Sequence, residues 1–406
     1  MPSFDSFRRL CAIAACLTIG ACTTGQAPPT PPAVPEPPPA PHQLTEQAPS
    51  FLTLPNTAAE RVPVRMGVIL PFSNSSANVR ALANALMRAA ELALYDSGNT
   101  NIILMTAEEG NTPEETAAAA QKVLDQGAEV IVGPLFAPSV SAVAPLARDR
   151  GVPVIAFSTD RSVAGNGIYL LSFQPQSEVR RIVAYAVSQG RTKIGAIVPQ
   201  TPYGEVVEAT FRDAVVQDKA AVCDIEHFNP SAGALTDPAA AIAKADCDSI
   251  LVPQGGLLLR GVVQTLNYSQ IDTTKVKLLG TGLWYESGTP KEPLLQGAWF
   301  AAPQPSLDEA FNTKYKQTFA SDPPQLASLS YDAVSLVALL ANGVPYHRFT
   351  FRALTDPNGF AGVDGIFRFR ADGSVERELA VLSVGPDGFK VADPAPVTFQ
   401  TPQVHS

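Results

Sequence analysis

The stretch "RMGVILP", residues 65–71, returns in altered form as "KIGAIVP" at residues 193–199. Both copies run in the same order: a basic residue, an apolar residue, a glycine, an apolar run and a closing proline. The copies start 128 residues apart (193 minus 65), and each opens a series in which strand patterns alternate with helical ones. The repeat predicts two similar lobes in tandem, each built on its own sheet.

The first series indicates a parallel sheet with helices on both faces. Its strand segments are continuous runs of Val, Ile and Leu, which is typical of strands covered on both sides. The predicted strands occupy residues 64–71, 101–109, 128–134 and 152–158, and the predicted helices 77–96, 111–127 and 137–151. Strands that alternate with helices in this way predict an α/β fold with a doubly wound parallel sheet.

The helix at 111–127 carries clear start and stop signals. Thr112 is the expected N-cap and Pro113 the first helical residue. Glu115 completes a capping box with Thr112, and Gly127 ends the helix.

The second series repeats the alternation, and the segments after it return to finish the lobes. Its predicted strands are 220–228, 248–254 and 276–281, and its predicted helices 202–219, 236–245 and 256–267. Later segments predict a strand at 297–303, helices at 306–319 and 326–343, and a hairpin over 363–384 that turns at Asp372-Gly373. We therefore expect discontinuous lobes: lobe 1 over about 61–174 plus 304–345, lobe 2 over about 175–303 plus 346–390, and a tail at 391–406.

The N-terminal segment has the features of an export signal. Arg8 and Arg9 precede an apolar run, residues 10–21, that is too short to span a bilayer. The run ends in "IGAC", which resembles the lipobox of bacterial lipoproteins and implies cleavage before Cys22 and lipidation of its sulfur. "IAAC", ending at Cys16, also fits but leaves a shorter apolar run. The alternatives are a signal peptide cut elsewhere or a buried helix with three cysteines.

These residues predict a signal peptide at 1–21 and a protein anchored by lipid on the periplasmic side of the outer membrane, because Thr23 rather than Asp follows the cysteine. A spacer at 22–60 follows, in which "PPTPPAVPEPPPAP", residues 28–41, contains nine prolines in fourteen positions. Such a run favours polyproline II over helix or sheet, and the spacer could reach on the order of 100 Å.

Composition excludes several classes of function. The chain carries a net charge of −9, or −10 after removal of 1–21 (27 minus 37), which argues against nucleic acid as a partner. No later segment approaches 18 consecutive apolar residues. The sequence has no G-x-S-x-G, H-E-x-x-H, phosphate-loop or C-x-x-C pattern, so we expect neither an enzyme nor a cofactor or metal site.

Two cysteines remain for the folded body, Cys223 and Cys247, and in an oxidising compartment they predict a disulfide.

The body, about residues 62–390, resembles the type I periplasmic-binding fold of the leucine/isoleucine/valine-binding protein family. The resemblance rests on "GAEVIVGPLFAPSVSAVAPLARDRGVPVIAFST", "PYGEVVEATFRDAV" and "GIFRFRADGSV". Within that superfamily "IVGPL", "QSEVRRIVAYAVSQG", "GTGLWYESG" and "LLQGAWFAAP" look like the lipoprotein activators of penicillin-binding proteins. The best-known members of that branch carry an N-terminal helical-repeat domain, and here the proline spacer stands in its place.

The resemblance implies a ligand site between the lobes, where loops follow the carboxyl ends of strands. The loops concerned are 70–76, 133–139, 156–160 and 199–204, with an aromatic wall near 284. The predicted ligand-binding residues are Ser73, Asn74, Ser139, Ser158, Thr159, Asp160, Tyr203 and Trp284. In amino-acid binders of the family, hydroxyl groups and backbone N–H groups clamp the ligand carboxylate. Asp160 stands on or next to one clamping position and would repel that carboxylate, unless Thr159 takes the role. Plain helix capping is the alternative for the serines.

Two functions of different classes follow. The first is a non-enzymatic envelope lipoprotein that regulates peptidoglycan synthesis by activating a penicillin-binding protein, and that binds free amino acids weakly or not at all. The second is a lipid-anchored receptor of an ABC transporter, with the permease as its partner and an amino acid or other small polar molecule as its ligand.

Overall fold

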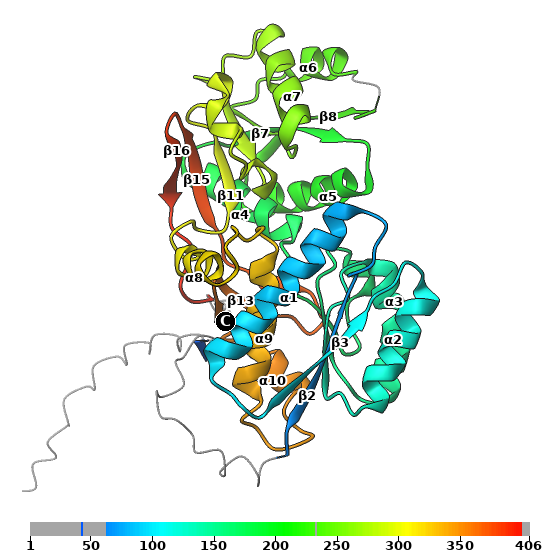
Figure 1. Cartoon of the computed structure of the whole chain (residues 1–406). Helices are drawn as coiled ribbons and strands as arrows, with labels where there is room; N and C mark the ends of the chain where they lie inside the picture. Colours follow the sequence, from blue (N-terminus) through cyan, green and yellow to red (C-terminus); the bar gives the residue numbers. More distant parts are fainter. Residues whose placement is uncertain (1–41, 44–61, 232–233, 400–406) are drawn as a thin grey trace, which may run out of the picture. The chain divides into compact units, whose positions relative to one another are not determined.

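The computed structural model describes residues 42–43, 62–231 and 234–399 (Figure 1). All of these described residues belong to one compact unit. The predictions for the signal peptide, for Cys22 and for most of the spacer lie outside the described residues.

The first lobe is built on a five-stranded sheet in which every strand is parallel to its neighbours, in the order β3-β2-β4-β5-β6. The strands are β2 Val64–Leu70, β3 Ile102–Glu108, β4 Val130–Val132, β5 Val154–Ala156 and β6 Ile168–Leu170. Helices α1 Ala77–Ser97 and α9 Ala327–Leu340 cover one face of the sheet, and α2 Pro113–Asp125 and α3 Ala137–Asp149 cover the other. In Figure 1, α2 and α3 lie together beside β2 and β3.

The second lobe has a seven-stranded sheet in the order β16-β15-β11-β10-β9-β7-β8, in which β15 runs antiparallel to both of its neighbours, β11 and β16, and the other pairs are parallel. The strands are β7 Lys193–Pro199, β8 Ala221–Phe228, β9 Ser249–Leu251, β10 Lys277–Gly280, β11 Trp299–Ala302, β15 Ala380–Gly385 and β16 Gly388–Asp393. Helices α4 Pro175–Ser188 and α5 Pro202–Gln217 cover one face. Helices α6 Thr236–Ile242 and α7 Gly256–Tyr268 cover the other. The short helices η3 Gly282–Trp284, η4 Thr289–Lys291 and η5 Pro293–Leu295 join β10 to β11.

The internal repeat corresponds to equivalent places in the two sheets. β2 pairs with β3 and β4, and β7 pairs with β8 and β9, so each opening strand lies between the two strands that follow it in sequence. Both strands are almost wholly buried, as their continuous apolar runs require. The predicted doubly wound α/β architecture is confirmed.

The capping signals of α2 are largely confirmed. The Glu115 N–H donates to Thr112 Oγ1 at 3.2 Å, and Pro113 opens the helix. The carboxylate of Glu115 reaches one residue further back than a capping box requires, because it accepts the N–H of Asn111 at 2.7 Å. Gly127 follows the helix with a φ of +84°, a conformation that glycine adopts without strain.

The segment that links the lobes near the C-terminus differs from the sequence prediction. Residues 349–375, which we assigned to lobe 2, contribute their apolar side chains to the core of lobe 1. They form α10 Phe351–Leu354 and a small sheet of β12 Phe360–Gly362, β13 Gly365–Phe369 and β14 Val375–Arg377, while α8 Glu309–Phe319 packs nearby. The predicted hairpin turns at Asp372-Gly373 but ends at Arg377, because the chain then crosses into the second sheet as β15.

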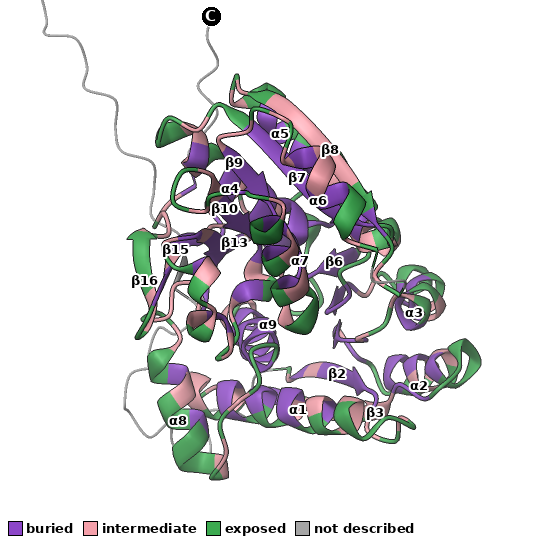
Figure 2. Cartoon of the chain, turned by 90° about the horizontal axis from the view of Figure 1, so that it is seen from above, coloured by how far each residue is buried: buried purple, intermediate pink, exposed green. Residues whose placement is uncertain are grey.

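Two further features concern helix α9 and the start of the chain. Residues 327–338 of α9 are all buried, and Figure 2 shows the helix mostly in the colour of buried residues. β1 His42–Gln43 pairs with β12, so the spacer contributes a short strand where the sequence predicted none. No helix within the described ranges is long and apolar enough to cross a membrane.

Cys223 on β8 and Cys247 before β9 form a disulfide, which is the pair that the sequence predicted. Their Cα atoms lie 5.5 Å apart, within the ordinary range for such a bond. The two sulfur atoms lie over Gly195 on β7, where a Cβ atom would be 2.9 Å from the sulfur of Cys247. The glycine of the repeat therefore leaves the space that the disulfide occupies.

Candidate functional site

The predicted ligand loops follow the carboxyl ends of β2, β4 and β5 in lobe 1 and of β7 and β10 in lobe 2. In parallel sheets these ends share one edge, where helix N-termini present free N–H groups. What each loop can bind depends on whether the protein itself already occupies those donors.

The loop before α1 is organised by its own polar side chains. Asn74 Oδ1 accepts the N–H of Ser76 at 3.0 Å, and Arg80 Nη1 donates to the carbonyl of Asn74 at 2.6 Å. Ser73 is exposed. Asn74 thus acts as a turn-forming residue, and a ligand role for Ser73 and Asn74 stays a prediction.

The loop before α3 is occupied by a carboxylate of the protein. Glu109, directly after β3, has no exposed surface. Its Oε2 accepts the N–H of Leu135 at 2.9 Å, and its Oε1 accepts the N–H of Phe136 at 3.1 Å. Burial raises the pKa of Glu109, and hydrogen bonds from Leu135, Phe136 and Ser139 act in the opposite direction.

Ser139 belongs to the same cluster. Its side chain is buried and lies 3.4 Å from Thr116 Oγ1, and its hydroxyl lowers the pKa of the neighbouring Glu109. Thr116 Oγ1 in turn donates to the backbone carbonyl of Glu109. The hydroxyl that the sequence assigned to a ligand therefore contacts the protein's own carboxylate.

The polar side chains of the loop after β5 form hydrogen bonds within the loop. The buried Ser158 Oγ accepts the N–H of Asp160 at 3.1 Å, and Asp160 Oδ1 accepts the N–H of Ser162 at 2.9 Å. Asp160 thereby caps the short helix η2 Arg161–Val163. Thr159 and Asp160 are both exposed, so either could meet a ligand, and a carboxylate ligand would meet the charge of Asp160.

Lobe 2 presents a phenol and a second buried carboxylate. Tyr203, in the first turn of α5, places its hydroxyl 3.1 Å from Thr281 Oγ1, just beyond β10. Glu178, in the first turn of α4, accepts the N–H of Gly282 at 3.0 Å. Burial raises the pKa of Glu178 to about 7, against the lowering effect of that one hydrogen bond. Burial, followed by the charge of Glu178, also raises the pKa of Tyr203.

Trp284 is a core residue, and its assignment to an aromatic wall of the site was wrong. The side chain has no exposed surface, and its Nε1 donates to the carbonyl of Val252 at 3.0 Å. The indole packs against Phe300 with the ring centroids 6.0 Å apart. Gly280 makes this possible, because a Cβ atom there would lie 2.2 Å from the indole ring.

Three carboxylates thus lie close to these loops: Glu109 directly after β3, Asp160 in the loop after β5, and Glu178 in the first turn of α4. Each of them accepts at least one backbone N–H group. An arrangement of carboxylates and hydroxyl groups favours a ligand that offers hydrogen-bond donors or positive charge, and it disfavours an anion. Within the described ranges no group of three or more His, Cys, Asp and Glu side chains is placed to hold a metal ion.

Sequence reasoning missed Glu109 and Glu178. Glu109 could have been found from its position, because "AEEG" places a carboxylate at the carboxyl end of a parallel strand. Glu178 gives no such signal, since its partner Gly282 lies 104 residues further along the chain.

Comparison with known proteins agrees with this architecture. The sequence profile of the family described as "Periplasmic binding protein" matches residues 63–389. An uncharacterized protein of Rickettsia prowazekii is 20% identical over 175 residues, a match that covers 43% of this chain and 46%, less than half, of that relative's length.

Solved structures share the fold at low sequence identity. A proposed branched-chain amino acid ABC transporter protein of Rhodospirillum rubrum superposes with a TM-score of 0.71 at 19% identity, covering 81% of this chain and 99% of the other. A branched-chain amino acid transporter substrate-binding protein of Streptococcus pneumoniae, solved with isoleucine, gives 0.58 at 19% identity, covering 82% and 100%.

Proposed function

Because the chain belongs to the periplasmic binding protein family, of type I, we propose that it acts by binding and not by catalysis, as a lipid-anchored envelope protein that regulates peptidoglycan synthesis by activating a penicillin-binding protein. The sequence features that look like the activator branch motivate the choice of partner. The geometry of the candidate site motivates the rejection of free amino acids as ligands.

The observation that carries the proposal is the carboxylate of Glu109 on the N–H groups of Leu135 and Phe136. A receptor for free amino acids needs donors for the ligand carboxylate, and these two donors are taken. A ligand carboxylate brought close to Glu109 and Asp160 would also be repelled. This arrangement supports a protein whose important partner is another protein.

The lipid anchor is part of the proposal. Lipidation of Cys22, with residues 22–41 preceding the β1 strand that pairs with β12, would place the body up to about 60 Å from the outer membrane, which suits a protein that reaches into the cell wall toward a synthase. Mass spectrometry of the N-terminal peptide from membranes should show a lipidated Cys22. An unmodified Cys22, or cleavage before Cys16, would contradict the anchor.

The partner is tested with the full-length protein in detergent and the penicillin-binding proteins of the same cell. We expect one of them to bind in a pull-down and to polymerise or cross-link glycan strands faster when the protein is added. Deletion of residues 28–41 should abolish the effect in cells and leave binding in detergent intact. Absence of both binding and rate enhancement with every penicillin-binding protein would refute this function.

A second function, a solute receptor of an ABC transporter, is favoured by the fold that the chain shares with solute-binding proteins of such transporters. In that role Tyr203, Thr281 and Glu178 would contact a small ligand with amine or hydroxyl groups. A saturable thermal shift with such a ligand, lost in Tyr203→Phe, together with no bound penicillin-binding protein, would favour the receptor.

A further inference from the structure

A cavity of about 200 Å³ lies at the junction of the two lobes, away from the ligand loops. Its lining includes residues of the first turns of α4 and of the segment that crosses from lobe 1 to lobe 2. The lining residues that matter here are Ser177, Arg180, Arg370, Glu376, Arg377 and Glu378. Arginine is the commonest residue of this lining, although the chain as a whole has a net charge of −9.

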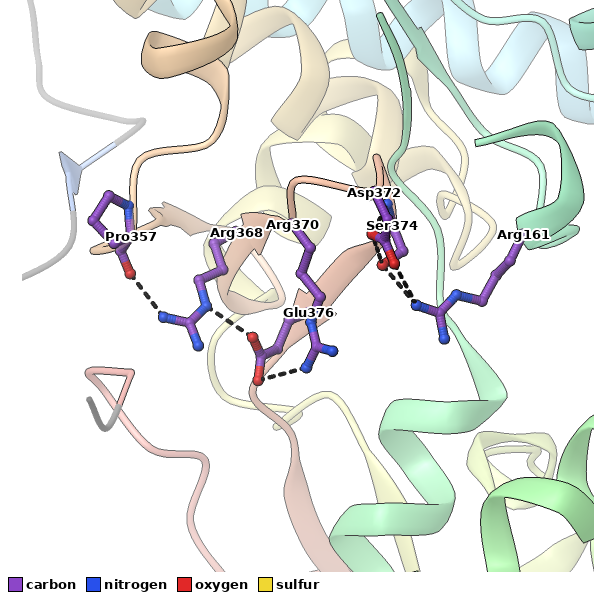
Figure 3. Close-up of polar contacts among 7 residues, drawn as sticks. All are labelled: Arg161, Pro357, Arg368, Arg370, Asp372, Ser374 and Glu376. Atoms are coloured by element: carbon purple, nitrogen blue, oxygen red, sulfur yellow. Dashed lines mark hydrogen bonds and ion pairs between the residues drawn. The ribbon is translucent and has the colours of Figure 1, made fainter. Parts of the chain in front are cut away.

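Several charges around the cavity are already paired. Figure 3 shows Arg368 and Arg370 converging on Glu376, at 2.8 and 3.1 Å. Arg161 reaches the hairpin turn and donates to Ser374 Oγ at 2.7 Å. Arg181, which also lines the cavity, pairs with Asp393 at 2.5 Å. Glu376 therefore shares one negative charge between two guanidinium groups.

Two arginines retain unused donors. Arg180 makes no hydrogen bond or ion pair to any residue that the structure describes. Burial, followed by the charges of Arg370 and Arg161, lowers its pKa, while the charges of Asp213 and Glu376 act in the opposite direction. Arg377 is 5% exposed, and its Nε and Nη1 have no hydrogen-bond partner, although its Nη2 lies 3.5 Å from Asp332.

We propose that this cavity is a binding site for a phosphate group, held by the guanidinium groups of Arg180 and Arg370 and supported by Arg377 and the Ser177 hydroxyl. A planar guanidinium group matches two oxygens of one phosphate, and a doubly charged anion can satisfy two such groups at once. A buried arginine with unused donors is costly without a partner of this kind.

The size of the cavity limits the ligand. At about 200 Å³ it exceeds a single water several-fold but falls below the ~300–1,000 Å³ of pockets that enclose a drug-sized ligand. It therefore suits the phosphate group itself, either free or as the exposed head of a larger phosphate ester that stays outside. The site is independent of the ligand loops and does not rest on the proposed function.

The carboxylate of Glu378 should repel a bound anion. Its replacement is therefore a control that should change phosphate affinity in the direction opposite to the replacement of Arg180. Its carboxylate lines the cavity and has no hydrogen-bond partner among the described residues. Burial, followed by the charge of Glu376, raises its pKa. Replacing this carboxylate by an amide removes repulsion without removing a donor, so it should strengthen phosphate binding.

A bound phosphate would also connect the lobes. Arg180 lies on α4, whose apolar face packs in lobe 2, whereas Arg370 lies on the β13–β14 hairpin, which packs in lobe 1. An anion held by both arginines would fix α4 against the hairpin at the point where the chain crosses between the lobes.

The test is isothermal titration calorimetry of the full-length protein in detergent at low ionic strength, with inorganic phosphate, diphosphate and glycerol phosphate. Arg180→Gln should weaken binding about tenfold or more, and Glu378→Gln should strengthen it several-fold. Arg150→Gln is the matched control, because Arg150 pairs with Asp125 on an exposed surface of lobe 1 and should not affect binding.

Tighter binding of glycerol phosphate than of inorganic phosphate would identify a phosphate ester, such as a lipid head group, as the source. The reverse order would identify the free ion. The proposal is overturned if none of the three anions binds the wild-type protein, if Arg180→Gln binds as the wild type does, or if Glu378→Gln weakens binding.

Discussion

Both lobes place a buried glutamate against backbone N–H groups of a loop that follows a parallel strand, but they do so to different degrees. In lobe 1, Glu109 accepts two N–H groups, those of Leu135 and Phe136. In lobe 2, Glu178 accepts one, that of Gly282. The loops differ in position, because Leu135 and Phe136 follow β4 whereas Gly282 follows β10, whose counterpart in lobe 1 is β5. The carboxylates also come from different places: one follows a strand and the other lies on a helix.

The difference shows how hydrogen bonds to a carboxylate counteract the increase in its pKa that burial causes. Burial raises the pKa of both carboxyl groups. With a single N–H donor the pKa of Glu178 reaches about 7, so this group is partly protonated near neutral pH. The result for a ligand is the same at these three N–H groups, because each already holds a carboxylate of the protein.

The opening strands show the same contrast between a shared backbone and different side chains. Gly67 on β2 lies against Val123 of α2, and a Cβ atom there would be 3.0 Å from the valine methyl group. Gly195 on β7 instead faces the disulfide of Cys223 and Cys247. One glycine allows a helix to approach its strand closely, and the other makes room for a covalent link that lobe 1 lacks among its described residues.

Removal of the disulfide should have the largest effect on stability. It should destabilise lobe 2 more than lobe 1. The bond joins residues 24 apart, and the double variant Cys223→Ser, Cys247→Ser should lose about 3 kcal/mol by the chain-entropy argument. Hydrogen exchange should accelerate in lobe 2 and change little in lobe 1. Uniform acceleration in both lobes would show that they unfold as one unit and would weaken the comparison.

The Glu178→Gln variant should be more stable than the wild type at pH 8. The folded pKa of about 7 lies above the ordinary 4.5, so the stability that protonated Glu178 contributes is fully present below pH 4.5 and is lost as the pH rises through 7. An amide keeps the acceptor for Gly282 without the charge, and the gain should approach about 3 kcal/mol at most.

Urea unfolding at pH 4.5 and pH 8 measures this gain, which should disappear at the lower pH. Glu205→Gln, an exposed residue of α5, is the control and should show no such dependence. A Glu178→Gln variant that is less stable than the wild type at pH 8 would contradict the account.

The Glu109→Ala variant should be less stable than the wild type, in contrast to Glu178→Gln. It leaves the N–H groups of Leu135 and Phe136 without a partner in a buried place, at a cost of about 2 kcal/mol. Glu109→Gln keeps one oxygen acceptor and should cost less than Ala. Thermal unfolding of the two variants measures their order of stability. An Ala variant as stable as the wild type would show that water replaces the carboxylate at no cost.

Tyr203→Phe should have the smallest effect, about 1 kcal/mol, because it removes one hydrogen bond to Thr281. Tyr95→Phe is a matched control, since Tyr95 is 82% exposed on α1. Equal stability of the two variants would mean that the phenol is free to serve a ligand and contributes nothing to lobe 2.

The architecture could be predicted from sequence because it depends on local patterns. Continuous apolar runs identified the strands, and Thr112 and Pro113 marked the start of α2. The crossing of the chain at Arg377 could not be predicted, because the hairpin and the following strand form one unbroken alternating pattern while pairing with different sheets.

The candidate site was less predictable, since its contacts are long-range. Trp284 has the sequence position of a site residue, and only the space above Gly280 explains why it turns into the core. The donors that bind Glu109 lie 26 and 27 residues further along the chain, so no local pattern connects them. Ser139 lies beside the loop, where its hydroxyl is 3.4 Å from Thr116 Oγ1, and its ligand role stays a prediction.

The central claim is that the N–H groups of Leu135, Phe136 and Gly282 already hold carboxylates of the protein and are therefore not free to hold a carboxylate ligand. The most direct test is a thermal-shift measurement of the full-length protein with leucine, isoleucine and the other common amino acids. The account predicts no shift with any of them. A ligand at 100 times its dissociation constant would stabilise the protein by about 2.7 kcal/mol, so binding would be seen readily. A clear, saturable shift with leucine or any other free amino acid would contradict the account.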